Sequence, residues 1–319
     1  MSTRAVSVVR LVQQRSILVL IALLVALAGL IEIIRPGAVN AHWVSNILEF
    51  AAPLGILAAG QTLVVITGGI DLSVANVATA AAYIMASQAP FGVTRSIVAG
   101  LLVGVAVGFV NGIGVGVFRV QPLIMTLAMG LVVTGSLNVY SQAAVRSVPG
   151  VPAVIHTLGS GTVLGYVPVS LFLWGLLGAA LIIGLRSTGF GRLLYAVGDN
   201  IEATRLAGVR GWQVLLANYA ACGLLSAVAG LVLSGTVNAA DLSLATVLLL
   251  PSVAAVVIGG TSIFGGSGSY SGTIVGALIL TVLNSVLTLL DVPDAVKQVL
   301  YGVIIVVLAA AYTRVLGHE

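Results

Sequence analysis

The stretch from Ser96 to Val117 reads SIVAGLLVGVAVGFVNGIGVGV, and it decides the fold class of the chain. It contains no charged side chain, and about 20 predominantly apolar residues are enough for a helix to cross a bilayer. Glycine recurs at every fourth position, and four residues turn a helix by about 400°, so the glycines form one narrow stripe. Because a stripe without side chains lets a neighbouring helix approach closely, we interpret it as a packing surface. Its members are Gly100, Gly104, Gly108, Gly112 and Gly116.

The composition of the whole chain is that of a membrane protein. Of its 319 residues, 59% are hydrophobic and only 7% are charged, whereas about a quarter of the residues of a soluble domain are charged. Most of the surface must therefore face lipid. The net charge of +4, without any basic run, gives no indication of a nucleic-acid partner. We expect one all-α transmembrane domain over residues 1–319.

Apolar runs divided by polar, glycine or proline breaks predict a polytopic helical bundle of about ten spans. The third of these is shorter than a bilayer-crossing helix normally is. The predicted spans cover residues 17–34, 47–67, 72–87, 96–117, 123–141, 167–185, 212–233, 246–263, 273–290 and 298–313.

The amino terminus allows two interpretations. Arg4, Arg10 and Arg15 precede an apolar run in which Ala26–Ala28 resembles a signal-peptidase site. The run nevertheless continues to Ile34, which makes it longer than the apolar core of a typical cleaved signal peptide. We therefore expect this segment to be retained as the first span.

Basic residues predict the orientation, because cytoplasmic loops of membrane proteins carry an excess of lysine and arginine. With the amino terminus in the cytoplasm, nine basic residues fall inside and four fall outside, so both termini are expected in the cytoplasm. The inner residues are Arg4, Arg10, Arg15, Arg119, Arg186, Arg192, Arg205, Arg210 and Arg314, and the outer ones are Arg35, Arg95, Arg146 and Lys297.

The segment TGGIDLS, from Thr67 to Ser73, is the most distinctive sequence in the chain. Two glycines loosen the helix before an acid, and non-helical backbone within a membrane is tolerated only where protein covers it or where it lines an aqueous cavity. An acid in such a place is a candidate functional residue. Asp71 or Ser73 can equally cap the third helix, and the two roles are compatible. The candidate pathway residues are Gln61, Asp71, Ser73, Asn76 and Asn111, of which the neutral amides also suit interhelical hydrogen bonds.

A weak internal repeat relates two distant parts of the chain. Asp71–Ala75 reads DLSVA at the start of the third span, and Asp241–Ala245 reads DLSLA before the eighth. In the predicted topology these segments lie on opposite faces of the membrane, as inverted repeats require, with spans two to five matching spans seven to ten. Five matching residues in so apolar a chain are compatible with chance as well as with a repeat.

A long inner loop from Arg186 to Gly211 carries four arginines together with Asp199 and Glu202. Within it, residues 197–209 alternate small and apolar residues with charges at helical spacing. We predict a short amphipathic helix that docks into a groove of another protein, and the alternative is a solvated loop. The candidate docking residues are Gly198, Asn200, Glu202, Ala203, Leu206 and Gly208.

The chain lacks the residue patterns of a metal centre and of nucleotide hydrolysis. No set of His, Cys, Asp and Glu has the spacing of metal ligands, and His42, His156 and His318 all fall outside the predicted spans. The glycine-rich segment Gly259–Gly268 lacks the lysine and hydroxyl residue of a phosphate-binding loop, so we interpret it as a tight turn. We therefore expect no bound cofactor, no metal and no enzymatic activity, with the energy for any transport supplied by a partner.

Three blocks of the sequence resemble the permease subunits of ribose-type ABC importers, which are binding-protein-dependent systems of the bacterial inner membrane. The first block runs from Leu54 to Ser73, the second surrounds Gly198–Gly208, and the third is Ala254–Ser262. They occur in the order typical of the family, and the resemblance covers nearly the whole chain. Four departures from the family pattern favour a sugar-importer branch with no assigned solute. The departures are Ala75, Leu249, Pro251 and Ser267.

The resemblance implies several partners. Two permease subunits, identical or different, would pair around a pathway and sit on two ATP-hydrolysing subunits or on one tandem ATPase chain. An extracytoplasmic binding protein would deliver a monosaccharide, and ATP used by the partner would drive alternating access through the inner loop. A nucleoside or a sugar-derived signal molecule is an alternative solute. An ion-coupled secondary transporter and a membrane enzyme are rivals from other classes, although an ion relay needs several acids and Asp71 is nearly alone.

Overall fold

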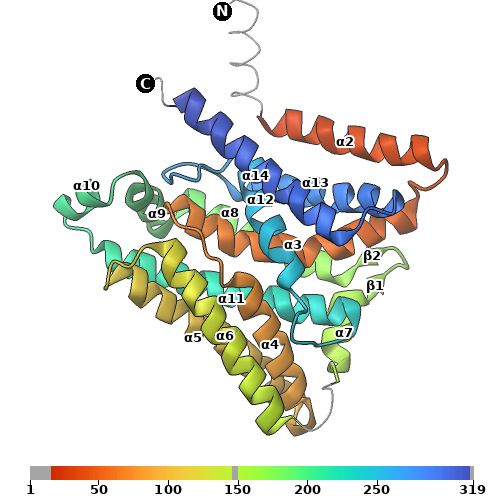
Figure 1. The fold of residues 1–319 in the computed structure, drawn as a ribbon, viewed down its shortest axis with the longest axis horizontal. Coiled ribbons are helices and arrows are strands. Elements are labelled where there is room, and N and C mark those ends of the chain that lie inside the picture. Colours follow the sequence, from red (N-terminus) through yellow and green to blue (C-terminus); the bar gives the residue numbers. More distant parts are fainter. Residues whose placement is uncertain (1–15, 146–149, 317–319) are drawn as a thin grey trace, which may run out of the picture.

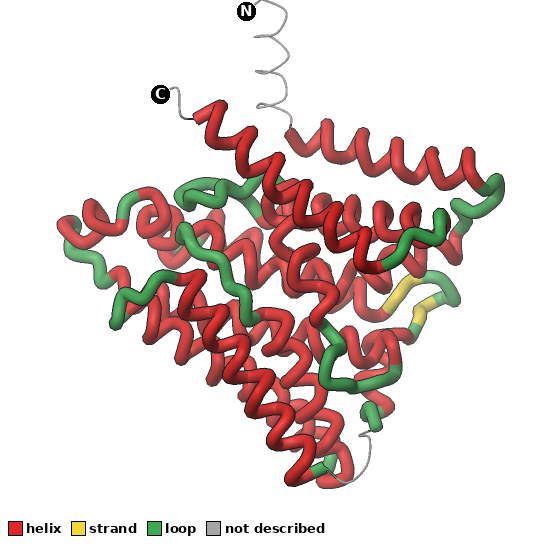
Figure 2. Tube along the Cα trace, in the orientation of Figure 1, coloured by secondary structure: helices red, strands yellow, loops and turns green. Residues whose placement is uncertain are grey.

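The computed structural model describes residues 16–145 and 150–316 (Figure 1). Five residues that carry predictions, Arg4, Arg10, Arg15, Arg146 and His318, lie outside the described residues. The described parts form thirteen α-helices, two 3-10 helices and one two-stranded hairpin (Figure 2). The prediction of a helical bundle is therefore confirmed.

The elements follow one another in three groups along the chain. The first group contains α2 (Ser16–Ile34), α3 (Ala41–Ile66), α4 (Val74–Gln88), η1 (Ala89–Phe91), α5 (Val93–Gly116) and α6 (Pro122–Ala144). The second contains α7 (Ala153–Ser160), β1 (Thr162–Val163), β2 (Val167–Pro168), α8 (Val169–Ser187), α9 (Gly189–Asp199) and α10 (Ile201–Leu206). The third contains α11 (Gly211–Val237), η2 (Thr246–Leu248), α12 (Leu249–Ile258), α13 (Tyr270–Leu289) and α14 (Asp294–Leu316).

Seven of the described helices, α2, α3, α5, α6, α8, α11 and α13, are long and apolar enough to cross a membrane. The protein is thus a multi-pass membrane protein. Helices occupy the positions of all ten predicted spans, but within the described residues seven rather than ten are long and apolar enough to cross a membrane, and α4, α12 and α14 are not among them. The helix α4 has 15 residues and α12 has 10, because the DLSVA and DLSLA segments before them and the glycines after α12 interrupt the helical backbone.

The helices α3 and α11 form the centre of the bundle. Every residue of α3 from Ala51 to Ile66 is buried, as expected for a helix that is apolar on nearly all sides, and Gln61 and Thr62 are the buried polar residues of this stretch. α3 contacts α8, α11, α12 and α13, while α11 also contacts α4, α5 and α7. By contrast, α2 lies along one edge of the bundle and leaves most of its side chains exposed for contact with lipid (Figure 1).

The glycine stripe of α5 lies mainly along its contact with α11. A Cβ atom on Gly104 would meet the carbonyl oxygen of Gly223, and one on Gly108 would meet the carbonyl oxygen of Tyr219. The two helix backbones therefore touch, and this close approach requires the absence of side chains. The remaining members, Gly100, Gly112 and Gly116, lie against Ala81 of α4, Leu216 of α11 and Trp212 of α11.

The helices α3–α6 and α11–α14, matched in chain order, make equivalent contacts. α5 contacts α11, and its counterpart α13 contacts α3. α4 also contacts α11, and its counterpart α12 contacts α3. The contacts of α4 with α5 and α6 likewise correspond to those of α12 with α13 and α14. The breaks before the short helices also fold alike. Asp71 Oδ1 accepts hydrogen bonds from the backbone N–H and hydroxyl of Ser73 at 2.8 and 2.6 Å, and Asp241 Oδ1 accepts those of Ser243 at 2.7 and 2.8 Å.

The connection between α6 and α8 contains elements that the sequence did not predict. The short helix α7 packs against α11, where Gly159 lies directly against the backbone of Gly235 and Thr236. The strands β1 and β2 then pair as an antiparallel hairpin with Val163 opposite Val167. This connection is therefore a folded cover over one end of α11.

Candidate functional site

A buried polar cluster surrounds the break between α3 and α4. We use the name polar cluster for Gln61, Asp71, Ser73, Asn111 and Cys222, all of which are buried. They come from α3, from the break itself, from α5 and from α11. Because the surroundings are apolar, these groups must satisfy their hydrogen bonds among themselves.

The carboxylate of Asp71 is 2% exposed and is held by neutral donors. Its Oδ1 atom accepts the two hydrogen bonds from Ser73, and the thiol of Cys222 lies 3.7 Å from Oδ2, to which it donates. No basic side chain forms an ion pair with Asp71 within the described ranges. Since a buried carboxylate without a cation is costly, these donors are essential to its placement.

The predicted cap of the short helix α4 is not formed. Ser73 is the N-cap residue, but its side chain makes no capping hydrogen bond to the first turn. Its hydroxyl instead donates to Asp71, and Asp71 accepts from the N–H of Ser73 itself. The prediction that Asp71 or Ser73 simply caps the helix is therefore wrong, because the pair closes a turn within the break.

Side chains from α3 and α6 form hydrogen bonds with the backbone N–H and C=O groups of the break. The amide of Gln61 donates to the carbonyl of Asp71 and accepts from its N–H, both at 3.3 Å. The hydroxyl of Thr126 donates to the carbonyl of Ile70 at 3.1 Å and accepts from the N–H of Leu72 at 3.0 Å. Non-helical backbone at this depth is thus covered by protein on two sides, which is the condition for its stability in a membrane.

The amide of Asn111 joins α5 to the break, and it donates to the hydroxyl of Ser73 at 3.0 Å. Two buried atoms, Asn111 Oδ1 and the hydroxyl of Tyr219 beside Gly69 of the break, have no hydrogen-bond partner in the described structure. Asn76, in contrast, does not join the cluster. It is half-buried on α4, and its side chain faces Gly130 of α6. Four of the five predicted pathway residues therefore come together, and one lies apart.

The sequence reasoning missed the contribution of α11 and α6 to this site. Cys222 touches Asp71, and Asn218 donates to the carbonyl of Leu63 at 3.0 Å. A signal was present, because Asn218, Cys222 and Ser226 recur every four residues on an apolar helix and so share one face. Thr126 carried no such signal, since a lone threonine in a membrane helix commonly bonds to its own backbone.

The α9–α10 segment, which covers residues 188–210, folds into two helices where one was predicted. Asn200 separates them with an extended backbone, φ −155° and ψ 101°, and its side chain accepts a hydrogen bond from the N–H of Ala203 at 2.9 Å. Asparagine is a favoured N-cap residue, so it ends α9 and starts α10. The hydroxyl of Thr204 then donates to the carbonyl of Ala196 at 2.9 Å and ties α10 to α9.

The α9–α10 segment is fixed to the bundle through backbone contacts. A Cβ atom on Gly198 would collide with the carbonyl oxygen of Ile66, the last residue of α3. The same carbonyl accepts a hydrogen bond from the N–H of Gly266 at 2.9 Å. The hydroxyl of Tyr195 donates to the carbonyl of Gly268 at 2.8 Å, and burial raises the pKa of Tyr195, so it remains a donor. The segment is therefore packed onto α3 and onto the glycine-rich turn.

The outer side of the α9–α10 segment is open. Leu206 is 79% exposed, and Glu202 forms an ion pair of 2.8 Å with Arg205 in which both side chains are largely exposed. Gly208 ends the segment with φ +83°, a conformation that favours glycine, and it has open space around it. An exposed leucine beside a charged pair on a short helix is suited to docking on another protein.

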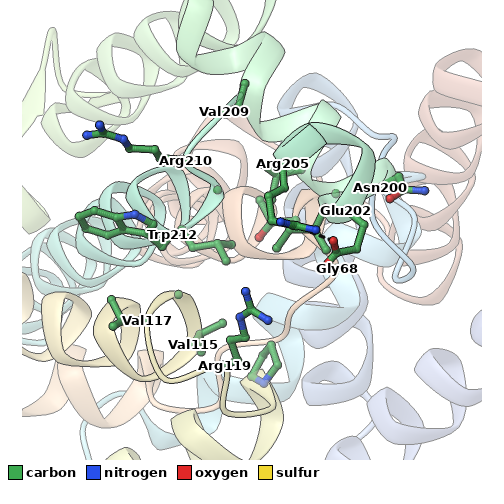
Figure 3. Close-up of a pocket in the computed structure, with 18 of the residues that line it drawn as sticks. Gly68, Val115, Val117, Arg119, Asn200, Glu202, Arg205, Val209, Arg210 and Trp212 are labelled. Atoms are coloured by element: carbon green, nitrogen blue, oxygen red, sulfur yellow. Dashed lines mark hydrogen bonds and ion pairs between the residues drawn. The ribbon is translucent and has the colours of Figure 1, made fainter. Parts of the chain in front are cut away.

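A cavity of about 1070 Å³ lies beneath the segment (Figure 3). It is bounded by the break after α3, the turn between α5 and α6, and the start of α11. Three arginines line it, and the side chains of Arg119 and Arg205 reach toward it from opposite sides (Figure 3). Arg119 and Arg210 have no acidic partner in the described parts of the chain. Asp199 and Glu202 also line the cavity, so the three arginines leave its lining with a small positive net charge.

Comparison with known proteins gives one family and several relatives. The family described as "Branched-chain amino acid transport system / permease component" matches residues 43–309. The ribose import permease protein RbsC of Escherichia coli strain K12 is 36% identical over 299 residues, which cover 92% of each chain. The fructose import permease protein FrcC of Rhizobium meliloti is 32% identical over 302 residues, covering 91% of this chain and 83% of the relative.

A third relative is named for a different solute. The autoinducer 2 import system permease protein LsrC of Yersinia enterocolitica is 31% identical over 289 residues, covering 88% of this chain and 78% of the relative. No solved structure matches the chain.

Proposed function

Because the chain belongs to the branched-chain amino acid transport system permease family, and within it to the ribose-type import permeases, we propose that it is the membrane-spanning subunit of an ATP-driven importer for a monosaccharide. The chain is a transport subunit, and the ATP is bound and hydrolysed by a separate partner. It needs no bound cofactor or metal for this role.

One contact in the structure supports the proposal independently of family membership. Gly198 of the α9–α10 segment touches the carbonyl of Ile66, and Asp71 of the polar cluster follows five residues later in the chain. A partner that pulls on the exposed face of this segment acts directly on the end of the most buried helix. This supports the segment as the mechanical joint that transmits ATP-driven movement to the membrane helices.

The assembly that we propose has several members. Two permease subunits, identical or different, pair in the bacterial inner membrane with both termini of each in the cytoplasm. Two ATPase subunits or one tandem ATPase chain bind the α9–α10 segments, and an extracytoplasmic binding protein delivers the solute on the other side. The basic residues at the α9–α10 end of the bundle support this orientation, because arginines are enriched on the cytoplasmic side.

We propose that the polar cluster braces the moving helices during alternating access. Gln61 and Asn111 connect the break to α3 and α5, and Asp71 with Ser73 fixes its turn. Asn76 has a separate role at the contact of α4 with α6. Such a brace holds non-helical backbone in one shape while its neighbours shift, and helix breaks of this kind are common in transporters.

A sugar-derived signal molecule is the second candidate solute. The likeness to an autoinducer 2 import permease, at 31% identity, supports it, although the ribose and fructose permeases have higher identities of 36% and 32%. All three solutes are small and hydroxylated, so the same pathway chemistry serves each of them.

The proposal is tested by uptake into proteoliposomes that hold the chain together with its ATPase subunit and its binding protein. We expect uptake of radiolabelled D-ribose, D-fructose or autoinducer 2 that requires ATP on the ATPase side. Uptake by the chain without the ATPase would contradict the proposal, as would the absence of uptake of all three solutes by the complete assembly.

A further inference from the structure

A second cavity, of about 350 Å³, lies between the ends of α13 and α14, and we call it the α13–α14 cavity. Residues from α3, α11 and α12 complete its walls. Its volume falls in the range of about 300–1,000 Å³ that is typical of small-molecule sites. The polar cluster shares no residue with it, and neither does the α9–α10 segment.

This cavity lies at the opposite end of α11 from the first one. Leu215, near the start of α11, lines the cavity beneath the α9–α10 segment, whereas Leu233 and Val237 line the α13–α14 cavity. A rise of 1.5 Å per residue places Leu215 and Val237 about 33 Å apart, which is the thickness of a bilayer core. The α13–α14 cavity therefore opens on the side opposite the α9–α10 segment.

The two cavities are also related by the repeat. The first is lined by the turn between α5 and α6 and by the break after α3. The second is lined by the facing ends of α13 and α14 and by Val237, which immediately precedes the break after α11. These elements correspond in the comparison of α3–α6 with α11–α14, and each cavity is completed by the central helix of the other half, α11 for the first and α3 for the second.

The walls of the α13–α14 cavity combine an apolar interior with a polar rim that carries no net charge. The interior is formed by buried or half-buried apolar side chains. On the rim, the side chains of Asn284 and Gln298 are exposed, and neither they nor the Tyr301 hydroxyl form a hydrogen bond within the described structure. The interior residues are Pro53, Leu54, Leu233, Leu248, Pro251 and Leu280.

The charged groups on the rim neutralise each other. Lys297, the single lysine of the chain, forms an ion pair of 2.9 Å with Asp294 and donates to the hydroxyl of Thr288 at 3.0 Å. The rim therefore offers amide donors and acceptors and a phenol, with no net charge to attract an ion. The exposed ring of Phe50 adds an aromatic face beside them.

We propose that the α13–α14 cavity binds a neutral, polyhydroxylated molecule of monosaccharide size as it enters from the outer side. The C–H faces of a sugar suit the apolar interior and the ring of Phe50, while its hydroxyls suit the free amides of Asn284 and Gln298. This inference rests on the proposed import of a sugar, and it adds the place in this chain where the solute is received.

The test is protection of engineered cysteines in the complete transporter in intact cells. Asn284→Cys and Gln298→Cys place thiols on the rim, and Leu164→Cys in the exposed hairpin is the control outside the cavity. The native Cys222 is fully buried and serves as the unreactive background. We expect a membrane-impermeant thiosulfonate to modify all three engineered thiols, and D-ribose or D-fructose to slow modification of the two rim thiols severalfold without affecting Leu164→Cys.

Ribose 5-phosphate, which is charged, should protect neither rim thiol. The inference is overturned if the rim thiols stay unreactive while Leu164→Cys reacts, or if neither sugar slows their modification in cells that still take up solute. Failure of the proposed function is seen in a different measurement. Uptake of the solute would then be independent of the ATPase, whatever the result of the thiol labelling.

Discussion

Gly198 of α9 lies directly against the carbonyl oxygen of Ile66, the last residue of α3. The N–H of Gly266 donates to the same carbonyl, so α9, α3 and the glycine-rich turn meet at one point. Beyond this point the backbone leaves the helix and enters the break that contains Asp71. We therefore expect a displacement of α9 to be transmitted through backbone atoms, without flexible side chains between them.

Gly198→Ala should weaken both the fold and the coupling. The added methyl group would overlap the carbonyl oxygen of Ile66, and neither backbone can yield without moving a helix. Overpacking of this kind costs about 1–3 kcal/mol. We expect a lower melting temperature of the purified protein and a loss of solute-stimulated ATPase activity in proteoliposomes.

Gly184→Ala is the matched control for this substitution. Gly184 lies in α8 with nothing near the position of a Cβ atom, and alanine favours helix by about 1 kcal/mol over glycine. We expect an unchanged or slightly higher melting temperature and normal coupling. If Gly198→Ala behaves like Gly184→Ala in both measurements, the contact with Ile66 does not transmit movement.

Glu202→Lys should reduce ATPase coupling while leaving the fold intact. The side chain is exposed on α10, and its ion pair with Arg205 contributes only about 0–1 kcal/mol to stability. Reversing the charge changes the surface that the ATPase subunit is proposed to bind. The measurement is solute-stimulated ATPase activity beside a melting curve.

The double variant Glu202→Arg, Arg205→Glu separates two explanations of that result. It restores an ion pair within α10 but leaves the charges exchanged on the surface. Recovery of stimulation in the double variant would mean that only the internal pair matters, and the docking role of Glu202 would be lost. We expect no recovery.

The sequence predicted the fold class and the helix positions because both depend on local patterns. Apolar runs set the spans, and the glycine period predicted the close contact of α5 that the structure places against α11. The shortness of α4 was predicted, but that of α12 was less accessible, and the breaks before both helices are stabilised by distant side chains. Gln61 and Thr126 form hydrogen bonds with the backbone of the break before α4, and no regular spacing in the sequence indicates these contacts.

The polar cluster was predicted only in part, because local sequence patterns reveal its polar residues but not how the helices bring them together. Gln61, Asp71, Ser73 and Asn111 were chosen as polar residues in apolar runs, which is a local property. That Cys222 reaches Asp71, and that Asn76 faces Gly130 of α6, depends on how four helices pack. The α13–α14 cavity was not predicted at all, because five helices contribute to it and no single segment carries its pattern.

Gly104→Leu should prevent correct packing of α5 on α11. Its Cβ atom would already meet the carbonyl of Gly223, and a leucine side chain has no space at this contact. We expect poor accumulation and rapid proteolysis of the variant in membranes. The control is Gly175→Leu in α8, where nothing lies near the Cβ position, so that variant should accumulate normally. Equal accumulation of the two variants would show that the stripe is not a tight contact.

Removing the carboxylate should matter at Asp71 and not at Asp241, although both accept the same two hydrogen bonds from a serine two residues later. Asp71 is buried, so Asp71→Ala leaves unsatisfied donors inside the bundle at a cost of about 1–3 kcal/mol, whereas water replaces the exposed carboxylate of Asp241. Asp71→Asn keeps one acceptor oxygen for Ser73. We expect uptake to fall strongly in Asp71→Ala, less in Asp71→Asn and little in Asp241→Ala, with comparable protein in the membrane. Equal uptake in Asp71→Ala and Asp241→Ala would refute the bracing role of Asp71.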